Sequence, residues 1–275
     1  MAKSILHDEH LLLGALMADG ADGRTHALHY GSSAEQQGDA LTLLSDLTGL
    51  GSRLMYGSDS DAFASAAFAG ERLGIGEVSA EAVLAGDGAL VSVALLARTG
   101  DAEFACWDLC GRGDVLSSWL SFLAGIEQQG TPAFQDVQIE DASEALVPLL
   151  LWGPEATSVL CDYLHGQTPP EPGTVKNLAL DAIGCLVAHP KLDNQPCFLV
   201  LVPPRSARVL WRSFLSFTSV TPVGTQGLLT RVAATIPTIA PACESGDRVI
   251  VAGKSLKQVG LVRSDPSFVG ARSLT

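Results

Sequence analysis

The chain has 275 residues, of which 17 are lysine or arginine and 30 are aspartate or glutamate, so its formal charge is −13. At about 100–200 residues per domain, this length allows one large domain or two to three small ones. The hydrophobic fraction of 47% excludes wholesale disorder. The net negative charge excludes a protein that binds nucleic acid or an anionic membrane through its overall electrostatic attraction.

The N-terminal region predicts neither a signal peptide nor a membrane span. Residues 1–29 contain an apolar patch, Leu11–Met17, but His7 to His10 interrupt any leader-like run. The longest apolar runs, 145–153 and 198–204, are far shorter than the roughly 20 residues that a span needs. The six cysteines form no CxxC pair and lie mostly in apolar runs. We therefore expect a cytoplasmic protein with reduced, buried thiols.

Two stretches of the chain, 52–123 and 146–217, are similar when offset by 94 positions. In the first, an apolar run ending at Gly57 precedes a predicted helix over 61–73, with Ser58 or Asp59 as its cap. Strands are predicted over 89–98 and 103–109, followed by a helix capped by Asp114. The apolar stripe of that helix is predicted to be Val115, Leu116, Trp119, Leu120 and Leu123.

The second stretch repeats this order. After an apolar run ending at Gly153, a helix is predicted over 155–164, with Pro154 in its first turn. Strands are predicted over 178–188 and 196–202. A closing helix capped by Ser206 is expected to bury the stripe Val209, Leu210, Phe214 and Phe217.

The repeated β-α-β-β-α order predicts an α+β fold of duplicated ferredoxin-like (split βαβ) units, each completed by a strand from elsewhere. We assign residues 1–50 plus 137–240 to the first unit and 51–136 to the second. Residues 241–275 form a short C-terminal β segment, with strands predicted over 248–252 and 258–263. Such a segment is too short to close a barrel on its own.

Several landmarks resemble the glycine-cleavage T-protein (aminomethyltransferase) family of folate-binding proteins. The similar segments lie in the family's order over about residues 30–270: Tyr30 to Ser32 with Glu35, 44–48 (LSDLT), 56–63 (YGSDSDAF), 151–156 (LWGPEA), 223–234 (VGTQGLLTRVAA) and 259–264 (VGLVRS). The resemblance implies a fold of α+β units around a central tetrahydrofolate site. It also implies transfer of an aminomethyl carbon from a carrier protein to that folate. The chain looks like a divergent member with a shortened C-terminal domain.

The family's functional positions carry over unevenly. Where the family has an Asp facing the reacting folate nitrogen, this chain has Ser92 and Val93. Asp108 falls where the family has an Asn, and Gln195 falls where it has a pterin-binding Glu. Arg231 matches the family's arginine as it stands, and Tyr30 belongs to the first similar segment. The resemblance therefore implies folate-binding roles for Asp108, Gln195, Arg231 and Tyr30, and leaves the catalytic residue unknown.

Two further arginines, Arg98 and Arg112, are candidates for holding the glutamate tail of a folate. The spacing His7-x-x-His10 and His26-x-x-His29 would suit a metal, but the loop between the pairs argues against one, so no metal site is predicted. Neither Gly-x-Gly segment has the strand-to-helix context of a phosphate loop, so no nucleotide site is predicted.

Three functions stay open from the sequence. The first is a tetrahydrofolate-dependent one-carbon transferase, for which the missing acid at Ser92 and Val93 is unfavourable. The second is a non-catalytic protein on the same scaffold that acts by binding a ligand or a partner. The third is a subunit of a larger amine-oxidising complex. The expected ligand is a small-molecule folate, with a protein partner open and no nucleic-acid or membrane partner.

Overall fold

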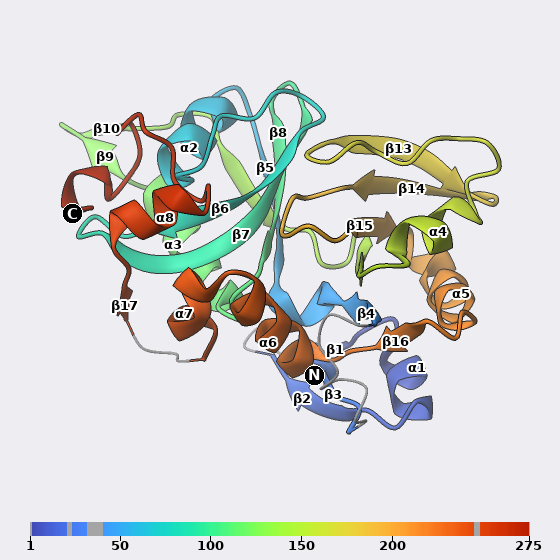
Figure 1. Cartoon of the computed structure of the whole chain (residues 1–275). Helices are drawn as coiled ribbons and strands as arrows, with labels where there is room; N and C mark the ends of the chain where they lie inside the picture. Colours follow the sequence, from blue (N-terminus) through green and yellow to red (C-terminus); the bar gives the residue numbers. More distant parts are fainter. Residues whose placement is uncertain (1, 21–23, 32–40, 245–247, 275) are drawn as a thin grey trace. The chain divides into compact units, whose positions relative to one another are not determined.

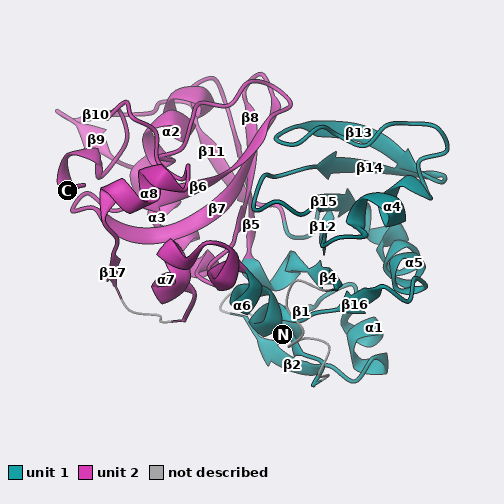
Figure 2. Cartoon of the chain, in the orientation of Figure 1, with its two compact units in different colours: residues 1–50, 143–231 teal, residues 51–142, 232–275 magenta. Residues whose placement is uncertain are grey.

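The computed structural model describes residues 2–20, 24–31, 41–244 and 248–274. The chain divides into two compact units, each built from two separate segments (Figure 2). Unit 1 comprises residues 1–50 and 143–231, and unit 2 comprises residues 51–142 and 232–275. The C-terminal segment, which the sequence pattern set apart as 241–275, is thus grouped with 51–142.

Unit 1 contains a six-stranded sheet in the order β13-β14-β15-β12-β4-β16 (Figure 1). Its strands are β4 (Thr42–Asp46), β12 (Val147–Trp152), β13 (Val175–Leu180), β14 (Ile183–Ala188), β15 (Cys197–Val202) and β16 (Val220–Pro222). All neighbours are antiparallel except β16 and β4. The helices are α4 (Ala156–Cys161), α5 (Pro204–Leu215) and α6 (Thr225–Thr235), whose last residues belong to unit 2.

The N-terminal part of unit 1 forms a separate three-stranded sheet in the order β1-β3-β2. Its strands are β1 (Ala2–Lys3), β2 (Leu16–Asp19) and β3 (Arg24–His29). Helix α1 (His7–Leu12) lies between β1 and β2 in the chain. A short helix, η3 (Leu47–Leu50), follows β4.

Unit 2 contains a second six-stranded sheet, in which β11-β5-β8-β7-β17 are consecutive and β6 pairs with β7. Its strands are β5 (Ser52–Tyr56), β6 (Val78–Leu84), β7 (Ala89–Gly100), β8 (Glu103–Asp108), β11 (Gln138–Asp141) and β17 (Val249–Ile250). Strands β9 (Glu127–Gln128) and β10 (Thr131–Pro132) form a small hairpin. Its helices are α2 (Ser60–Ala67), α3 (Gly113–Ala124), η4 (Pro237–Ile239), α7 (Ala240–Glu244), α8 (Gly253–Gln258) and η5 (Ala271–Ser273).

The two similar stretches have matching elements. The order β5-α2-β6-β7-β8-α3 in unit 2 corresponds to β12-α4-β13-β14-β15-α5 in unit 1. The spatial strand order also matches, because β5, β8, β7 and β6 adjoin one another as β12, β15, β14 and β13 do. Each set is extended beside its first strand, by β11 in unit 2 and by β4 in unit 1. The chain is therefore a mixed α+β protein.

Each stretch contains one strand more than the sequence pattern predicted. The segment predicted as a single strand, 178–188, is a hairpin of β13 and β14, because Asp181 adopts a positive φ of 52° and turns the chain. The corresponding strand in unit 2, β6, was missed. The predicted tail strand 258–263 is also wrong, since α8 extends to Gln258 and no strand follows it in the described tail.

The predicted helix boundaries need correction as well. Helix α2 ends at Ala67 rather than at Leu73, because Phe68 is extended and bridges to Val83. Neither Ser58 nor Asp59 caps α2 with its side chain; Asp59 Oδ2 instead accepts from the amides of Gln135 (2.7 Å) and Asp136 (3.0 Å). Helix α4 likewise ends at Cys161 rather than at Leu164.

The apolar faces of the closing helices differ slightly from the predicted stripes. Helix α5 begins at Pro204, two residues before Ser206, and buries Ala207, Leu210, Trp211 and Phe214. These positions recur with the 3.6-residue period, which leaves Val209 exposed. Helix α3 in the same way buries Leu116, Leu120 and Leu123 and exposes Val115. In each unit these helical faces join the sheet in one hydrophobic core.

Candidate functional site

Arg231 lies in α6 of unit 1 and is only 6% exposed. Its Nη2 donates to Asp193 Oδ2 at 3.1 Å and to Gln195 Oε1 at 3.2 Å. Its guanidinium carbon lies 4.8 Å from the ring centroid of Trp152, a distance suited to a cation–π contact. Burial lowers the pKa of Arg231, and the Asp193 carboxylate supplies the opposite charge that a buried guanidinium requires.

Asp193 organises the rest of this group. Its Oδ1 accepts from Trp152 Nε1 at 3.2 Å and from the backbone amide of Gln195 at 2.8 Å, while its Oδ2 accepts from Arg231 Nη2. Trp152 ends the fully buried strand β12, and the Gly153 amide donates to the Pro196 carbonyl at 3.0 Å. The end of β12 and α6 therefore fix the loop before β15, which carries Asp193 and Gln195.

We call Trp152, Asp193, Gln195 and Arg231 the Arg231 cluster. It combines a guanidinium, a carboxylate and an amide, so it can offer both donors and acceptors to a planar heterocycle. Gln195 and Arg231 were predicted from the sequence as site residues, and the structure brings these two together. The role of Asp193 was missed, because its only sequence signal is its position two residues before Gln195.

Ser92 and Asp108 meet in the interior of unit 2, and both are fully buried. The Ser92 hydroxyl donates to the Asp108 carboxylate. Asp108 Oδ2 also accepts from the Arg112 amide at 2.7 Å, and the amides of Cys110 and Gly111 donate to the same carboxylate. Burial raises the pKa of Asp108 to about 6, although these hydrogen bonds favour its charged form. The carboxylate thus holds the turn between β8 and α3.

Tyr30 belongs to a third group, in unit 1. Its hydroxyl is hydrogen-bonded to His10 Nδ1 at 2.7 Å, and His10 Nε2 lies 3.1 Å from Asp46 Oδ2. Asp46 Oδ1 accepts from the Thr48 amide at 2.9 Å. From the sequence, His10 was considered only as a metal ligand and was not linked to Tyr30. Ser32 and Glu35 of the first similar segment lie outside the described residues.

The two other candidate arginines are held by acceptors of the chain itself. Arg98 Nη1 donates to Asp61 Oδ1 at 2.7 Å and to the Leu73 carbonyl at 3.1 Å. Arg112 Nη1 donates to the carbonyls of Leu90 and Val91 at 3.0 and 3.1 Å. Both arrangements join elements within unit 2.

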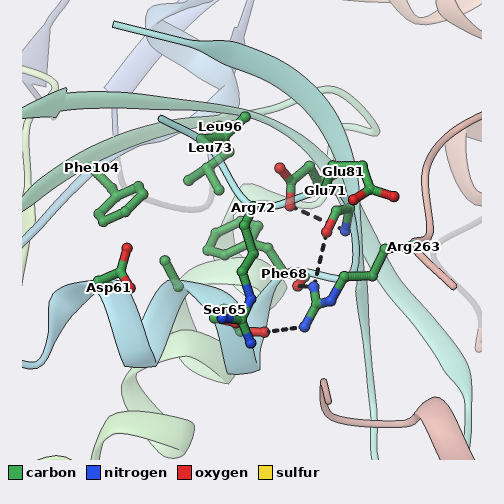
Figure 3. A pocket seen from close by; sticks show the side chains of 12 residues that line it. Asp61, Ser65, Phe68, Glu71, Arg72, Leu73, Glu81, Leu96, Phe104 and Arg263 are labelled. Carbon is green, nitrogen blue, oxygen red and sulfur yellow. Dashed lines mark hydrogen bonds between the residues drawn. The ribbon is translucent and has the colours of Figure 1, made fainter. Parts of the chain in front are cut away.

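A small hollow in unit 2 has a cavity volume of about 20 Å³, and Arg263 and Glu81 lie at its wall (Figure 3). Arg263 donates to the carbonyls of Ser65, Phe68 and Gly70 at 2.6, 2.8 and 2.9 Å. Glu81 accepts from Ser79 Oγ at 2.6 Å and from the Gly70 amide at 3.2 Å, and burial raises its pKa to about 7. The three bonds of Arg263 fasten the C-terminal segment to residues 65–70, so the hollow is part of the packing of unit 2.

Within the described ranges, no three His, Cys, Asp or Glu side chains are arranged to hold a metal ion. None of the helices described is long and apolar enough to cross a membrane.

No known family pattern matches the sequence, and no curated protein matches it either. Among solved structures, the chain is similar to the glycine cleavage system aminomethyltransferase T from Bartonella henselae, with a TM-score of 0.69 and 18% identity. That match covers 99% of this chain and 73% of the other. A heterotetrameric sarcosine oxidase from Corynebacterium sp. U-96 is matched with a TM-score of 0.45 and 16% identity, over 84% of this chain and 97% of the other. Because the first match covers nearly the whole chain with a TM-score of 0.69, the chain has the fold of an aminomethyltransferase T-protein.

Proposed function

We propose that this chain is a folate-binding protein related to the tetrahydrofolate-dependent aminomethyltransferases, and that the Arg231 cluster contacts its ligand. The observation that carries the proposal is the joining of Arg231 to Gln195 by a hydrogen bond of 3.2 Å. The resemblance to the T-protein family assigned ligand-binding roles to these two positions, which lie far apart in the sequence. Their contact supports a common site.

The chemistry of the cluster suits the pterin part of a folate. A pterin presents an edge of alternating donors and acceptors on a flat ring. Gln195 can accept and donate through its amide, and Asp193 can accept through its carboxylate. Arg231 holds both side chains and stacks on Trp152, so the polar groups are positioned before any ligand arrives.

A second candidate function, ligand binding without aminomethyl transfer, is favoured by the positions that replace the family's catalytic Asp. Ser92 and Val93 are fully buried, and neither carries a charge to stabilise a developing cation. Asp108 is bonded to Ser92, but its carboxylate is engaged by that hydroxyl and by the β8–α3 turn. The Asp108 carboxylate is therefore not available to a ligand, and we propose no folate contact through Asp108.

The matching element order also supports a finer proposal for the fold. Strands β12, β14 and β15 with helices α4 and α5 follow the split βαβ pattern, and β4 supplies the strand that flanks β12. The set β5, β7 and β8 with α2 and α3 follows the same pattern, with β11 in the flanking place. We propose that the core arose from two ferredoxin-like units.

The proposal is tested by titrating the purified chain with tetrahydrofolate and following tryptophan fluorescence, to which Trp152 contributes from its contact with Arg231. Saturable binding is expected. The variant Arg231→Ala is expected to weaken it by about 1–3 kcal/mol, as for the loss of a charged hydrogen-bonding partner. Gln195→Ala, in a half-buried loop, is expected to weaken binding with little effect on folding.

Arg205→Ala provides the matched control, because Arg205 is an exposed arginine of unit 1. It should leave the affinity unchanged. An absence of binding at millimolar tetrahydrofolate would exclude both candidate functions as folate-dependent ones. Equal affinities for the wild type and Gln195→Ala would show that the Arg231 cluster is not the site. Formation of methylene-tetrahydrofolate from an aminomethyl donor would decide for transfer over binding alone.

A further inference from the structure

A pocket in unit 1, which we call the Ser4 pocket, is separate from the Arg231 cluster. The residues that line it include Lys3, Ser4, Arg24, Thr48, Glu144 and Val147, all of which belong to unit 1. Its cavity volume is about 240 Å³. Val147 begins strand β12, whereas Trp152 of the Arg231 cluster ends it. The Ser4 pocket and the Arg231 cluster therefore lie at opposite ends of one strand.

Three separate segments of the chain form the Ser4 pocket and give it a local positive charge. Strand β1 pairs in parallel with β3, so that Lys3 lies beside Thr25. Arg24 of β3 donates from Nη2 to Glu144 Oε1 at 3.3 Å, which connects β3 to the segment before β12. The charged groups that line the pocket are thus two cations, Lys3 and Arg24, and one carboxylate. This balance is opposite in sign to the net charge of −13 of the whole chain.

The hydroxyl of Ser4 points to a ligand. Ser4 is only 7% exposed, and its Oγ has no hydrogen-bond partner among the described residues. Its backbone carbonyl accepts from the His7 amide at 3.1 Å, which fixes the residue just after β1. A buried hydroxyl without a partner is unfavourable for folding, because it has lost its hydrogen bonds to water. An acceptor atom of a ligand in the pocket would supply the partner that the protein does not.

Other polar groups of the pocket are already engaged by the protein. Thr48 Oγ1 donates to Asp46 Oδ1, and the Thr48 amide donates to the same oxygen at 2.9 Å. Arg24 is paired with Glu144, and its side chain is 16% exposed. Lys3 is exposed, and its ammonium carries three donors. The Ser4 hydroxyl and the Lys3 ammonium are therefore two donors for a ligand, as many as a carboxylate has oxygens.

We propose that the Ser4 pocket binds a small organic monocarboxylate. Its carboxylate oxygens accept from Ser4 Oγ and from the Lys3 ammonium, and its single negative charge balances the excess of one cation in the lining. Its carbon chain lies against Ile5 and Val147, which also line the pocket and pack in the hydrophobic core of unit 1. Drug-sized ligands occupy pockets of about 300–1,000 Å³, so a volume of about 240 Å³ limits the ligand to a smaller molecule.

The test titrates the isotopically labelled full chain with butyrate and follows its backbone amides by NMR. Saturable shifts are expected at residues 3–5 and 143–147, which line the pocket. Butylamine has the same carbon chain with the opposite charge, and inorganic phosphate has negative charge without a carbon chain. Each should bind at least about tenfold more weakly than butyrate, as for the loss of a charged hydrogen bond or of the apolar contact. The proposal is overturned if butyrate causes no saturable shift, if its shifts lie only at other residues, or if either control binds as tightly.

Variants of the two donors test the site itself. Ser4→Ala should weaken butyrate binding about tenfold, as for a hydrogen bond to a charged group, and Lys3→Ala about threefold, because an exposed ion pair contributes less. Lys191→Ala, which removes an exposed lysine of the same unit, is the matched control and should leave the affinity unchanged.

The stability of Ser4→Ala separates a binding role from a structural one. Because this variant removes a buried hydroxyl that has no partner, urea denaturation should show no loss of stability. A loss of stability would show that the hydroxyl is used by the fold, and an unchanged butyrate affinity would show that it contacts no ligand; either result overturns the proposal. Gln195→Ala should leave butyrate binding unchanged, so this test and the tetrahydrofolate titration fail independently.

Discussion

At the scale of single residues, several charged side chains of this chain are buried. They include Glu81, Asp108, Arg112, Arg231 and Arg263, whose exposures range from 0% to 7%. A charge removed from water is tolerated only when hydrogen bonds or an opposite charge replace the lost solvation. Each of these groups has such partners, and for Arg231 they are the residues that we propose contact a ligand.

The variant Asp193→Ala is expected to lower the free energy of unfolding by about 3 kcal/mol, because it leaves the Arg231 guanidinium buried without its counter-charge. The measurement is urea denaturation of the wild type, Asp193→Ala, Arg231→Met and the double variant. The double variant should be more stable than Asp193→Ala, since no buried charge remains. If the stability lost in the double variant equals the sum of the losses in the two single variants, the two side chains do not interact energetically.

The raised pKa of Glu81 predicts that the stability of the fold depends on pH. Its pKa is raised from an ordinary value of 4.5 to about 7 in the folded chain, so the unfolded chain releases this proton first as the pH rises. The contribution of Glu81 to stability is thus fully present below its unfolded pKa and is lost as the pH rises through about 7. About 2 kcal/mol should be lost between about pH 5 and pH 7.

The comparison that isolates this effect is urea denaturation of the wild type and Glu81→Gln at both pH values. The side-chain amide of this variant cannot ionise, and it can still pair with the Gly70 amide and the Ser79 hydroxyl. The variant should gain stability relative to the wild type as the pH rises. A difference that stays constant over this range would contradict the role given to the Glu81 carboxyl.

At the scale of elements, the transition from strand to helix is built in the same way in both stretches. Strand β5 ends before Gly57 and strand β12 before Gly153, and each is followed within a few residues by a helix. Both glycines have a positive φ, 119° and 147°, which residues with a side chain rarely adopt. Both were identified from the sequence as ends of apolar runs, and they lie at corresponding places in the two stretches.

Gly153→Ala is expected to destabilise the protein by roughly 3 kcal/mol or more. A Cβ at this position would lie 2.5 Å from the Leu41 carbonyl oxygen and 2.6 Å from the Thr42 Cα, both of which are backbone atoms. The control is Gly184→Ala in β14 of the same unit, where nothing lies within 4 Å of the added Cβ. Thermal unfolding of both variants tests this, and a loss in Gly184→Ala as large as in Gly153→Ala would contradict it.

At the scale of the whole molecule, each compact unit depends on two distant segments of the chain. In unit 2 the C-terminal segment contributes the buried side chains of Leu256, Leu261 and Phe268. It also contributes Arg263, whose guanidinium donates to three carbonyls between Ser65 and Gly70. The tail is therefore part of the unit and completes its packing.

Arg263→Ala is expected to lower the free energy of unfolding by about 3 kcal/mol, since three carbonyls lose a charged donor. The matched control is Arg272→Ala, an exposed arginine of the same tail, which should change stability by about 0.5 kcal/mol or less. In Arg263→Ala, hydrogen exchange should show that the backbone amides of α2 and β6 lose protection before those of unit 1. Uniform loss over both units would contradict the assignment of the tail to unit 2.

The sequence by itself determined the repeat, the positions of β8, β15, α3 and α5 to within a few residues, and the resemblance that led to Gln195 and Arg231. These follow from local apolar periodicity and from motifs, which are properties of short segments. Strand β6 was missed and β13 was merged with β14, because the turn at Asp181 requires a positive φ that its residue type only weakly indicates.

Only the tertiary structure decided which polar groups meet. Asp193 is hydrogen-bonded to Arg231 and Tyr30 to His10, and Glu81 and Arg263 line the same hollow, although the members of each pair are distant in the sequence. No local pattern encodes such pairs, since strand pairing and chain closure determine them. The buried state of Ser92 and Asp108 was decided in the same way, because both faces of β7 and β8 are covered there. In that buried place the Asp108 carboxylate accepts hydrogen bonds from Ser92 and from the turn between β8 and α3.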